Sequence, residues 1–368
     1  MESENSFVQN QSAISVQKNF GRSFIRGLFL NRQAFDKSEM VKKDFGRNTS
    51  LDAGYVSNDG KVSAWASMHH SFKAEVKEKT GFYTYGVQYT DPSWEIVAAS
   101  AVVQENYFAD MGFVQRTENY DAKRDTTIRV GFTDSVVSAT YRIRPKEGRV
   151  TRHNINLTNI YYTNSDWSFN ELFNEFNYSV DFRNTAAFQV STSRNEVDLL
   201  FPFSFVSDGE PLPAEKYTFA NVAASFSSDE RKMIRYGLGG QTGGFYNGQL
   251  SQAEADINFR VQPWGNLGFG YQWNKLDFPD NYGNEIITAL LAKLEIGFNR
   301  NLLWTTLFQY VDQNEFMGIN SRLQWRFSPM SDVFLVYVDN YDVFNGLSNV
   351  GGIQTNNRAV VLKVNYWY

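Results

Sequence analysis

Several things are scarce or missing in this chain of 368 residues. It has no cysteine, which excludes disulfide bonds and cysteine-ligated metal sites, and only three histidines. No run of about 18 consecutive apolar residues is present, which excludes a transmembrane helix. The net charge is only −5, so the sequence does not predict a nucleic-acid partner. Proline is also rare, with eight residues.

Aromatic residues are abundant, and the last segment, Arg358–Tyr368, shows what they are used for. Val360, Leu362, Val364, Tyr366 and Tyr368 share one side of a strand, because strand side chains have a period of two. A soluble domain seldom ends on such an apolar edge, whereas closing a barrel removes the edge. The segment is similar to the terminal strand by which outer-membrane barrels engage the barrel-assembly machinery, so that machinery is an expected partner.

Alternation of apolar and charged residues recurs upstream. The apolar sides of three strands carry Ala253 to Val261, Ile319 to Phe327 and Leu172 to Phe182, and the opposite sides are densely charged. Alternation alone does not separate a soluble sandwich from a membrane barrel. Many of these runs are ten to fifteen residues long, however, and globular strands are typically nearer five or six. The pattern therefore predicts strands with one side toward lipid and the other toward a polar interior.

Counting the runs predicts an all-β fold: a large antiparallel transmembrane β-barrel with about 19 strands, forming a single domain over 1–368. This count takes Lys123–Arg144 as one long, bent strand; if it is a hairpin, the count is about 20. Short connections alternate with longer ones at 32–46, 73–80, 105–122, 201–215, 278–284 and 342–357. Since bacterial barrels have even strand numbers, and no signal peptide begins at Met1, we expect that upstream strands are missing.

Short motifs spread along the chain resemble one family. They include Asn106–Arg116, Ser15–Arg22, Leu200–Phe203 with Pro211–Phe219, and Ser321–Phe327. The chain resembles a family of Gram-negative outer-membrane barrels of unknown function, in which the barrel usually follows a family-9-like carbohydrate-binding module. The resemblance implies localisation in the outer membrane, contact with membrane lipid, and a link to carbohydrate. It implies no catalytic residues.

Signals for chemistry are weak. His69 and His70 are adjacent in a strand and so point to opposite faces, His153 stands alone, and the sequence places no Ser or Asp beside the pair, which leaves a rim hydrolase as a third alternative. Asp277–Glu285 offers oxygen ligands for calcium, but the same residues suit a hairpin loop. Glycines 237–244 lack the Lys and helix of a phosphate loop and indicate bends or close approach in a strand. We predict no cofactor, metal site or catalytic residue, and hence no enzyme.

The polar sides of the strands supply the candidate site. The residues predicted to face the lumen are Glu171, Glu175, Asp181, Arg183, Glu254, Asp256, Arg260, Lys293, Glu295, Arg322 and Arg326. Such charges either form cross-strand ion pairs that stiffen the wall or tune the selectivity of a conduit. The predicted function is a polar-lined conduit or surface site for substrate passage, with Phe201–Glu215 as the loop expected to fold inward. The alternative is a non-conducting anchor that binds a partner protein or glycan.

Overall fold

The computed structural model describes residues 7–206, 209–313, 315–344 and 352–367. Tyr368, part of the expected last strand, lies outside them. Within these residues there are twenty-one β-strands and one short 3₁₀-helix, Asp280–Tyr282. The strands are β1 Val8–Phe20, β2 Ser23–Asp36, β3 Glu39–Val56, β4 Val62–Lys73, β5 Gly81–Thr90, β6 Trp94–Val103, β7 Glu118–Asp121, β8 Thr126–Arg129, β9 Phe132–Ile143, β10 Val150–Asn164, β11 Phe169–Phe182, β12 Ala187–Asp198, β13 Lys216–Ser227, β14 Ile234–Phe245, β15 Gly248–Val261, β16 Gly265–Asp277, β17 Asn284–Asn299, β18 Leu302–Val311, β19 Phe316–Ser328, β20 Ser331–Val343 and β21 Ile353–Asn365.

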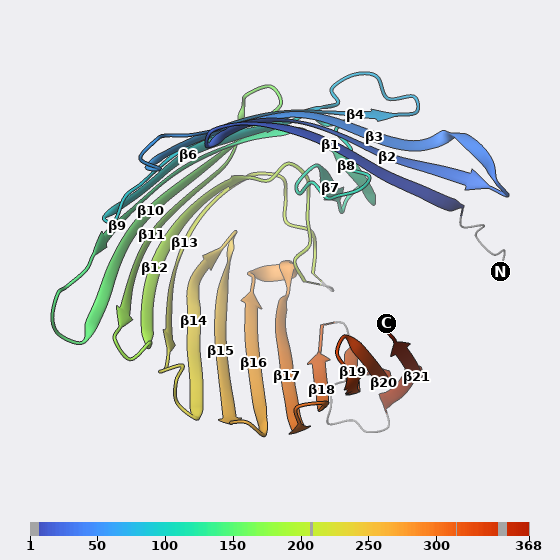
Figure 1. The fold of residues 1–368 in the computed structure, drawn as a ribbon. Helices are drawn as coiled ribbons and strands as arrows, with labels where there is room; N and C mark the ends of the chain where they lie inside the picture. The colour runs from blue at the N-terminus through green and yellow to red at the C-terminus, as the bar shows by residue number, and fades with distance from the viewer. Residues whose placement is uncertain (1–6, 207–208, 314, 345–351, 368) are drawn as a thin grey trace. The chain divides into compact units, whose positions relative to one another are not determined.

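Nineteen of the described strands form one sheet, and β7 and β8 form a separate pair. Strands that follow one another in the chain pair antiparallel, as in β1 with β2 and β20 with β21 (Figure 1). This confirms the predicted all-β fold class, a large antiparallel sheet of about 19 strands. No helix among the described residues is long and apolar enough to cross a membrane.

The chain divides into two compact units. Unit 1 comprises 1–143, 154–177 and 193–219, and unit 2 comprises 144–153, 178–192 and 220–368. In each unit, the connections at one end of the strands are short, for example Gly21–Arg22 in unit 1 and Arg300–Asn301 in unit 2. This agrees with the expected short turns on one rim.

Each unit has an apolar face and a polar face. In unit 1 the cross-strand row Leu51–Met68–Tyr83 belongs to the apolar face, and these three side chains are all exposed. In unit 2 the apolar face includes Ile257 and Phe269, which are register partners and are also exposed. The intervening residues form the polar face. Exposed apolar side chains on a whole sheet face suit contact with lipid.

Two sequence predictions about strands were wrong. Residues 32–46 are not a loop, because β2 and β3 continue to a two-residue turn at Lys37 and Ser38, both with positive φ, as a tight hairpin requires. Lys123–Arg144 is not one strand, because the chain leaves the main sheet before Gly131. A Cβ at Gly131 would lie 2.7 Å from the Val103 carbonyl oxygen, so only glycine fits this crossing. The count of nineteen in the main sheet nevertheless holds, since only β9 joins it.

Candidate functional site

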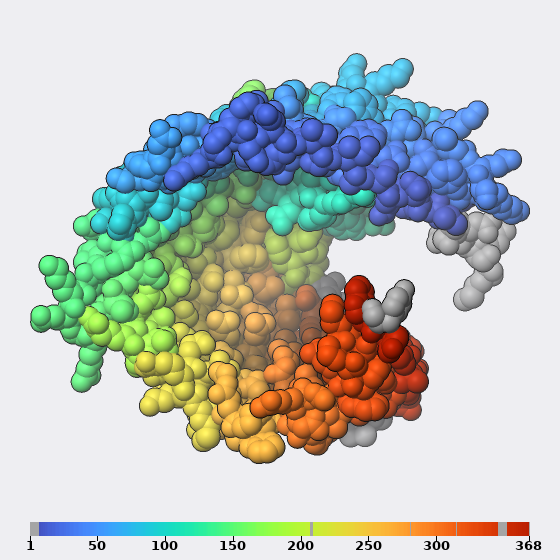
Figure 2. Space-filling view, in the orientation of Figure 1, coloured from blue at the N-terminus to red at the C-terminus, as the bar shows by residue number. Residues whose placement is uncertain are grey.

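The polar face of unit 1 carries a long connection folded against it, residues 104–131 between β6 and β9, which we call the inner loop. It contains β7 and β8, which lie on one side of strands β2–β4 (Figure 1). Figure 2 shows the turquoise atoms of this segment against the blue strands of the same unit. The sequence motif Asn106–Arg116 forms its first half. The inner loop is therefore the main structure covering this part of the polar face.

Asp110 fixes the first half of the inner loop to the wall. Its carboxylate accepts hydrogen bonds from Arg32 Nε and Nη2 at 3.0 and 2.8 Å and lies 3.0 Å from Lys73 Nζ. The Asp110 side chain is 8% exposed, so these bonds are largely shielded from water. Gly46 makes room for it, since a Cβ there would lie 2.0 Å from Asp110 Oδ2. A carboxylate held by two cations in this way is a strong anchor.

Phe108 gives the loop a second attachment. Its backbone N–H donates to Ser71 Oγ at 3.1 Å, and its carbonyl accepts from Asn48 Nδ2 at 2.8 Å. The centroid of its ring lies 4.4 Å from the Lys73 ammonium and 4.0 Å from the Arg129 guanidinium. These two cation–π contacts add to the attachment.

Apolar burial in unit 1 is concentrated around this loop and the connection 199–215. Tyr107 is buried and packs on Phe82, with ring centroids 5.5 Å apart, and burial raises the pKa of the Tyr107 phenol. Leu212 is 2% exposed, and its backbone pairs with Phe203. The two connections meet where the Ala122 N–H donates to the Pro202 carbonyl at 2.9 Å. The predicted inward loop, 201–215, thus contacts the inner loop.

Arg116 ties the second half of the inner loop to the wall. It forms an ion pair with Glu171 of β11 and stacks over the Tyr162 ring at 4.1 Å. Between the anchors at Asp110 and Arg116 lies Phe113, whose side chain is 83% exposed. An exposed phenyl ring held between two fixed points on a polar face is available to contact a solute.

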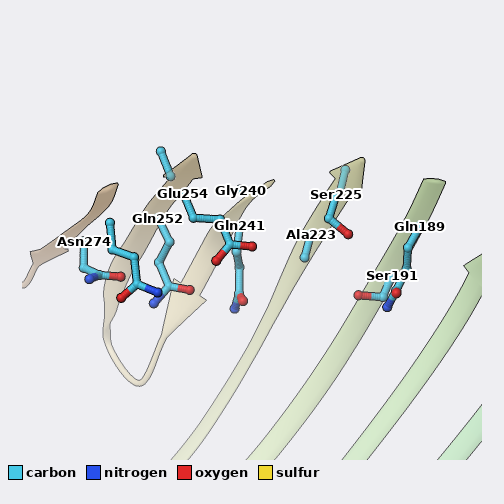
Figure 3. Close-up of a pocket in the computed structure, with 12 residues that line it drawn as sticks. Gln189, Ser191, Ala223, Ser225, Gly240, Gln241, Gln252, Glu254 and Asn274 are labelled. Atoms are coloured by element: carbon cyan, nitrogen blue, oxygen red, sulfur yellow. The ribbon is translucent and has the colours of Figure 1, made fainter. Parts of the chain in front are cut away.

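Unit 2 presents a different polar face, with no long loop on it in the described residues. A hollow of about 400 Å³, which we call the wall hollow, crosses five neighbouring strands (Figure 3). Its hydrogen-bonding side chains are nearly all neutral: Gln189, Ser191, Ser225, Gln241, Gln252, Gln272 and Asn274. Amides offer both a donor and an acceptor, so this surface suits an uncharged, hydrogen-bonding solute.

Glu254 lines the wall hollow, and Asp256 lies two residues further along β15 on the same face. A Cβ at Gly239 would lie 2.3 Å from Glu254 Oε1, and one at Gly237 would lie 2.2 Å from Asp256 Oδ1. The glycine run 237–244 therefore lets the carboxylates lie flat on β14, the close approach that the sequence predicted. Neither carboxylate forms an ion pair within the described parts of the chain.

The other candidate residues lie in varied surroundings. Asp181 accepts from Arg152 Nε at 2.7 Å, Lys293 lies 2.9 Å from Glu295, and Arg326 lies 3.2 Å from Asp332. Arg183 donates to the carbonyls of Lys146 and Gly148 at a short turn, which places it at a strand end. Glu175 is half-buried, whereas Arg260 and Arg322 are exposed. The set is thus a mixture of cross-strand pairs, one pair within a single strand (Lys293 and Glu295 of β17) and single charges.

The histidines have partners that the sequence did not reveal. His69 Nε2 lies 3.6 Å from Asp52 Oδ1, an aspartate that the sequence alone did not place beside the histidine. Asp52 is already bound by Arg26 Nε at 2.9 Å, and no serine hydroxyl hydrogen-bonds to His69 in the described part of the chain. His70 contacts Thr80 on the opposite face. Knowledge of the strand register would have revealed this contact. Ser50 is directly opposite His69, and Asp52 lies two residues further along β3, at the diagonal position.

The calcium candidate residues serve the turn. Asp277 pairs with Lys275 at 2.7 Å, and Asn284 Oδ1 accepts from the Phe278 N–H at 3.0 Å. Over the described residues, no group of three or more His, Asp or Glu gathers closely enough to hold a metal ion.

No family model matches the sequence, and comparison with curated proteins gives no match. Among solved structures, the chain is similar to the crystal structure of the siderophore receptor PirA from Acinetobacter baumannii. The TM-score is 0.41 and the identity 9%, with 97% of this chain and 74% of the receptor covered.

Proposed function

We propose that this protein is a Gram-negative outer-membrane barrel that passes a solute along its polar face, with the inner loop narrowing the passage. The observation that carries the proposal is the pairing of opposite faces. One face exposes apolar side chains such as Leu51 and Met68, and the other holds an ion-paired loop against charged strands. A polar face opposite a lipid-facing one must line water or protein in a barrel.

The last strand is fixed to its neighbour just beyond β21. The Trp367 N–H donates to Ser331 Oγ at 3.0 Å, and Ser331 is fully buried, which ties Trp367 to the start of β20. We propose that the barrel-assembly machinery engages this strand. Cell fractionation tests the localisation: the chain should sediment with outer-membrane markers and resist extraction by carbonate, and its recovery in the soluble fraction would contradict it.

We further propose that the solute is neutral and rich in hydroxyl groups, such as a saccharide. Each unit offers its own contact: the wall hollow of unit 2 supplies five amides, and in unit 1 Phe113 supplies an exposed ring. Amides hydrogen-bond hydroxyls in both directions, and an aromatic ring packs on the apolar side of a sugar ring.

Single-channel conductance in planar bilayers tests the conduit. We would compare the intact chain with one variant lacking 105–130 and another lacking 201–215, each bridged by a short glycine-rich turn. The inner-loop deletion should raise the unit conductance several-fold, and the 201–215 deletion should have a smaller effect. Shortening 278–283, a connection outside the inner loop, is the matched control and should leave conductance unchanged. Silence in all variants, with heat-modifiable gel mobility showing folded protein, would favour a non-conducting anchor.

A further inference from the structure

The apolar face of unit 2 carries an ion pair that has no part in the proposed conduit. Asp339 of β20 and Arg358 of β21 are register partners. Their neighbours on the same face are apolar: Asp339 is opposite Ile319 on its other side, and Leu335 and Val360 follow along the strands. An ionisable pair on a face that meets lipid is energetically costly, and such residues usually mark a functional site.

Asp339 holds Arg358 in a fixed position. Its Oδ2 accepts from Arg358 Nε at 3.0 Å, from Tyr337 Oη at 2.5 Å and from Tyr341 Oη at 2.6 Å. Arg358 Nη2 also donates to Tyr341 Oη at 3.2 Å. The carboxylate side chain is 2% exposed and the arginine side chain 54% exposed. The acid is therefore a buried positioning group, and the guanidinium is what the surface presents.

The free side of the guanidinium faces outward. Nε and Nη2 are engaged, whereas Nη1 makes no hydrogen bond with any described residue. An arginine offers N–H groups in a planar fork that matches the oxygens of a phosphate. Arg358 thus has donors available for an anionic group arriving from the lipid side.

Its height along the strand places Arg358 near the headgroups. At the short-turn end, Phe327 and Tyr366 stack with ring centroids 6.4 Å apart, as expected of one aromatic girdle. Arg358 lies eight residues from Tyr366, roughly 26 Å along a strand and about 20 Å along the membrane normal at the usual tilt. The apolar band of such barrels is about 25 Å tall, so Arg358 reaches the far interface by extending its side chain.

We infer that Arg358, positioned by Asp339 and flanked by Tyr337 and Tyr341, binds the phosphate of a lipid headgroup at the long-loop end of the apolar face. The tyrosines fit this placement, because phenol rings favour the headgroup zone. The inference needs only that the apolar face meets lipid, so it stands or falls separately from conductance.

Native mass spectrometry of the whole chain in detergent tests it. Phosphatidylglycerol is the probe, and a galactosyl diacylglycerol without phosphate is the comparison lipid. The protein should retain phosphatidylglycerol preferentially, and Arg358→Gln should weaken that retention about tenfold, the usual worth of charged hydrogen bonds. Arg358→Lys should fall between the two. Arg300→Gln, which removes an exposed arginine in a short turn, should change nothing.

Three results would overturn the inference. Equal retention of both lipids, or equal loss in the Arg300 and Arg358 variants, would show that the site does not recognise phosphate. Lipid-free dimers that disappear in Arg358→Gln would assign the surface to a second copy of the chain. Heat-modifiable mobility on gels establishes that each variant is folded.

Discussion

Replacing Asp110 with asparagine should release the inner loop from the wall. The change removes the charge shared by Arg32 and Lys73 but preserves side-chain shape. Breaking a buried pair by removing one partner costs about 3–5 kcal/mol. Lys73 is 32% exposed, and Arg32 keeps its bond to Asp44 at 2.7 Å, so we reduce the expected loss to about 2 kcal/mol.

That loss corresponds to roughly a thirtyfold rise in the population of detached loop. Hydrogen–deuterium exchange read by mass spectrometry measures it directly, as faster exchange confined to peptides from 104–131. In planar bilayers the same variant should show frequent excursions to a larger conductance. Gly46→Ala should act similarly, because its Cβ would occupy the space of the Asp110 carboxylate.

Asp44→Asn is the matched control for this experiment. Asp44 binds the same arginine but lies outside the inner loop and is more exposed, at 37%. Exchange in 104–131 should therefore stay at the wild-type rate in this variant. If peptides from 104–131 exchange as slowly in Asp110→Asn as in Asp44→Asn, the Asp110 contacts do not anchor the inner loop and the reasoning fails.

Three further predictions concern other parts of the molecule. The double variant Glu254→Gln with Asp256→Asn should shift the reversal potential in asymmetric potassium chloride toward anions, because two unpaired carboxylates leave the polar face; an unchanged potential would remove them from the conducting path. Phe113→Ala should weaken block of the current by neutral oligosaccharides several-fold, with Phe113→Tyr close to wild type, and equal block in both would exclude ring contact. The Arg231 side chain and backbone hold the pKa of Asp229 below its usual 3.8, so this carboxylate stabilises the β13–β14 turn above that pH and loses the effect as the pH falls. The protection of the 228–233 amides, corrected for the slower intrinsic exchange at low pH, should fall on acidification in the wild type and should already be low in Asp229→Asn.

The fold was predictable because strand alternation is strong and local. Consecutive residues such as Asp256 and Ile257 point to opposite faces of the sheet, and this can be predicted without knowing which strands are neighbours. The same argument failed at Lys37–Ser38, where charged residues looked like a loop although a turn with positive φ let the strands continue. It failed again at Gly131, because the close approach to Val103 and Ser165 that only glycine permits involves residues distant in sequence.

The site was less accessible to sequence reasoning. The alternation predicts that Glu171 faces the lumen, but its partner Arg116 comes from a connection 55 residues earlier, and no periodicity links them. The motif Asn106–Arg116 was noticed only as a resemblance, and its work, anchoring through Asp110 and Phe108, depends on Arg32, Ser71 and Asn48. The prolines of Phe201–Glu215 are a clear sequence signal for a loop. An aspartate that contacts two cations distant in sequence gives no such signal.

The polar faces of unit 1 and unit 2 differ in how their charged side chains are neutralised. In unit 1 the inner loop supplies countercharges for the wall, so that Arg32, Lys73 and Glu171 are all satisfied by loop residues. In unit 2 no described loop does so, and neutral amides replace most charges around Glu254 and Asp256. Amide side chains that are not engaged by a loop keep donors and acceptors available for a solute. Under the proposed function, we expect unit 1 to hold the inner loop in place and unit 2 to contact the solute through its amides.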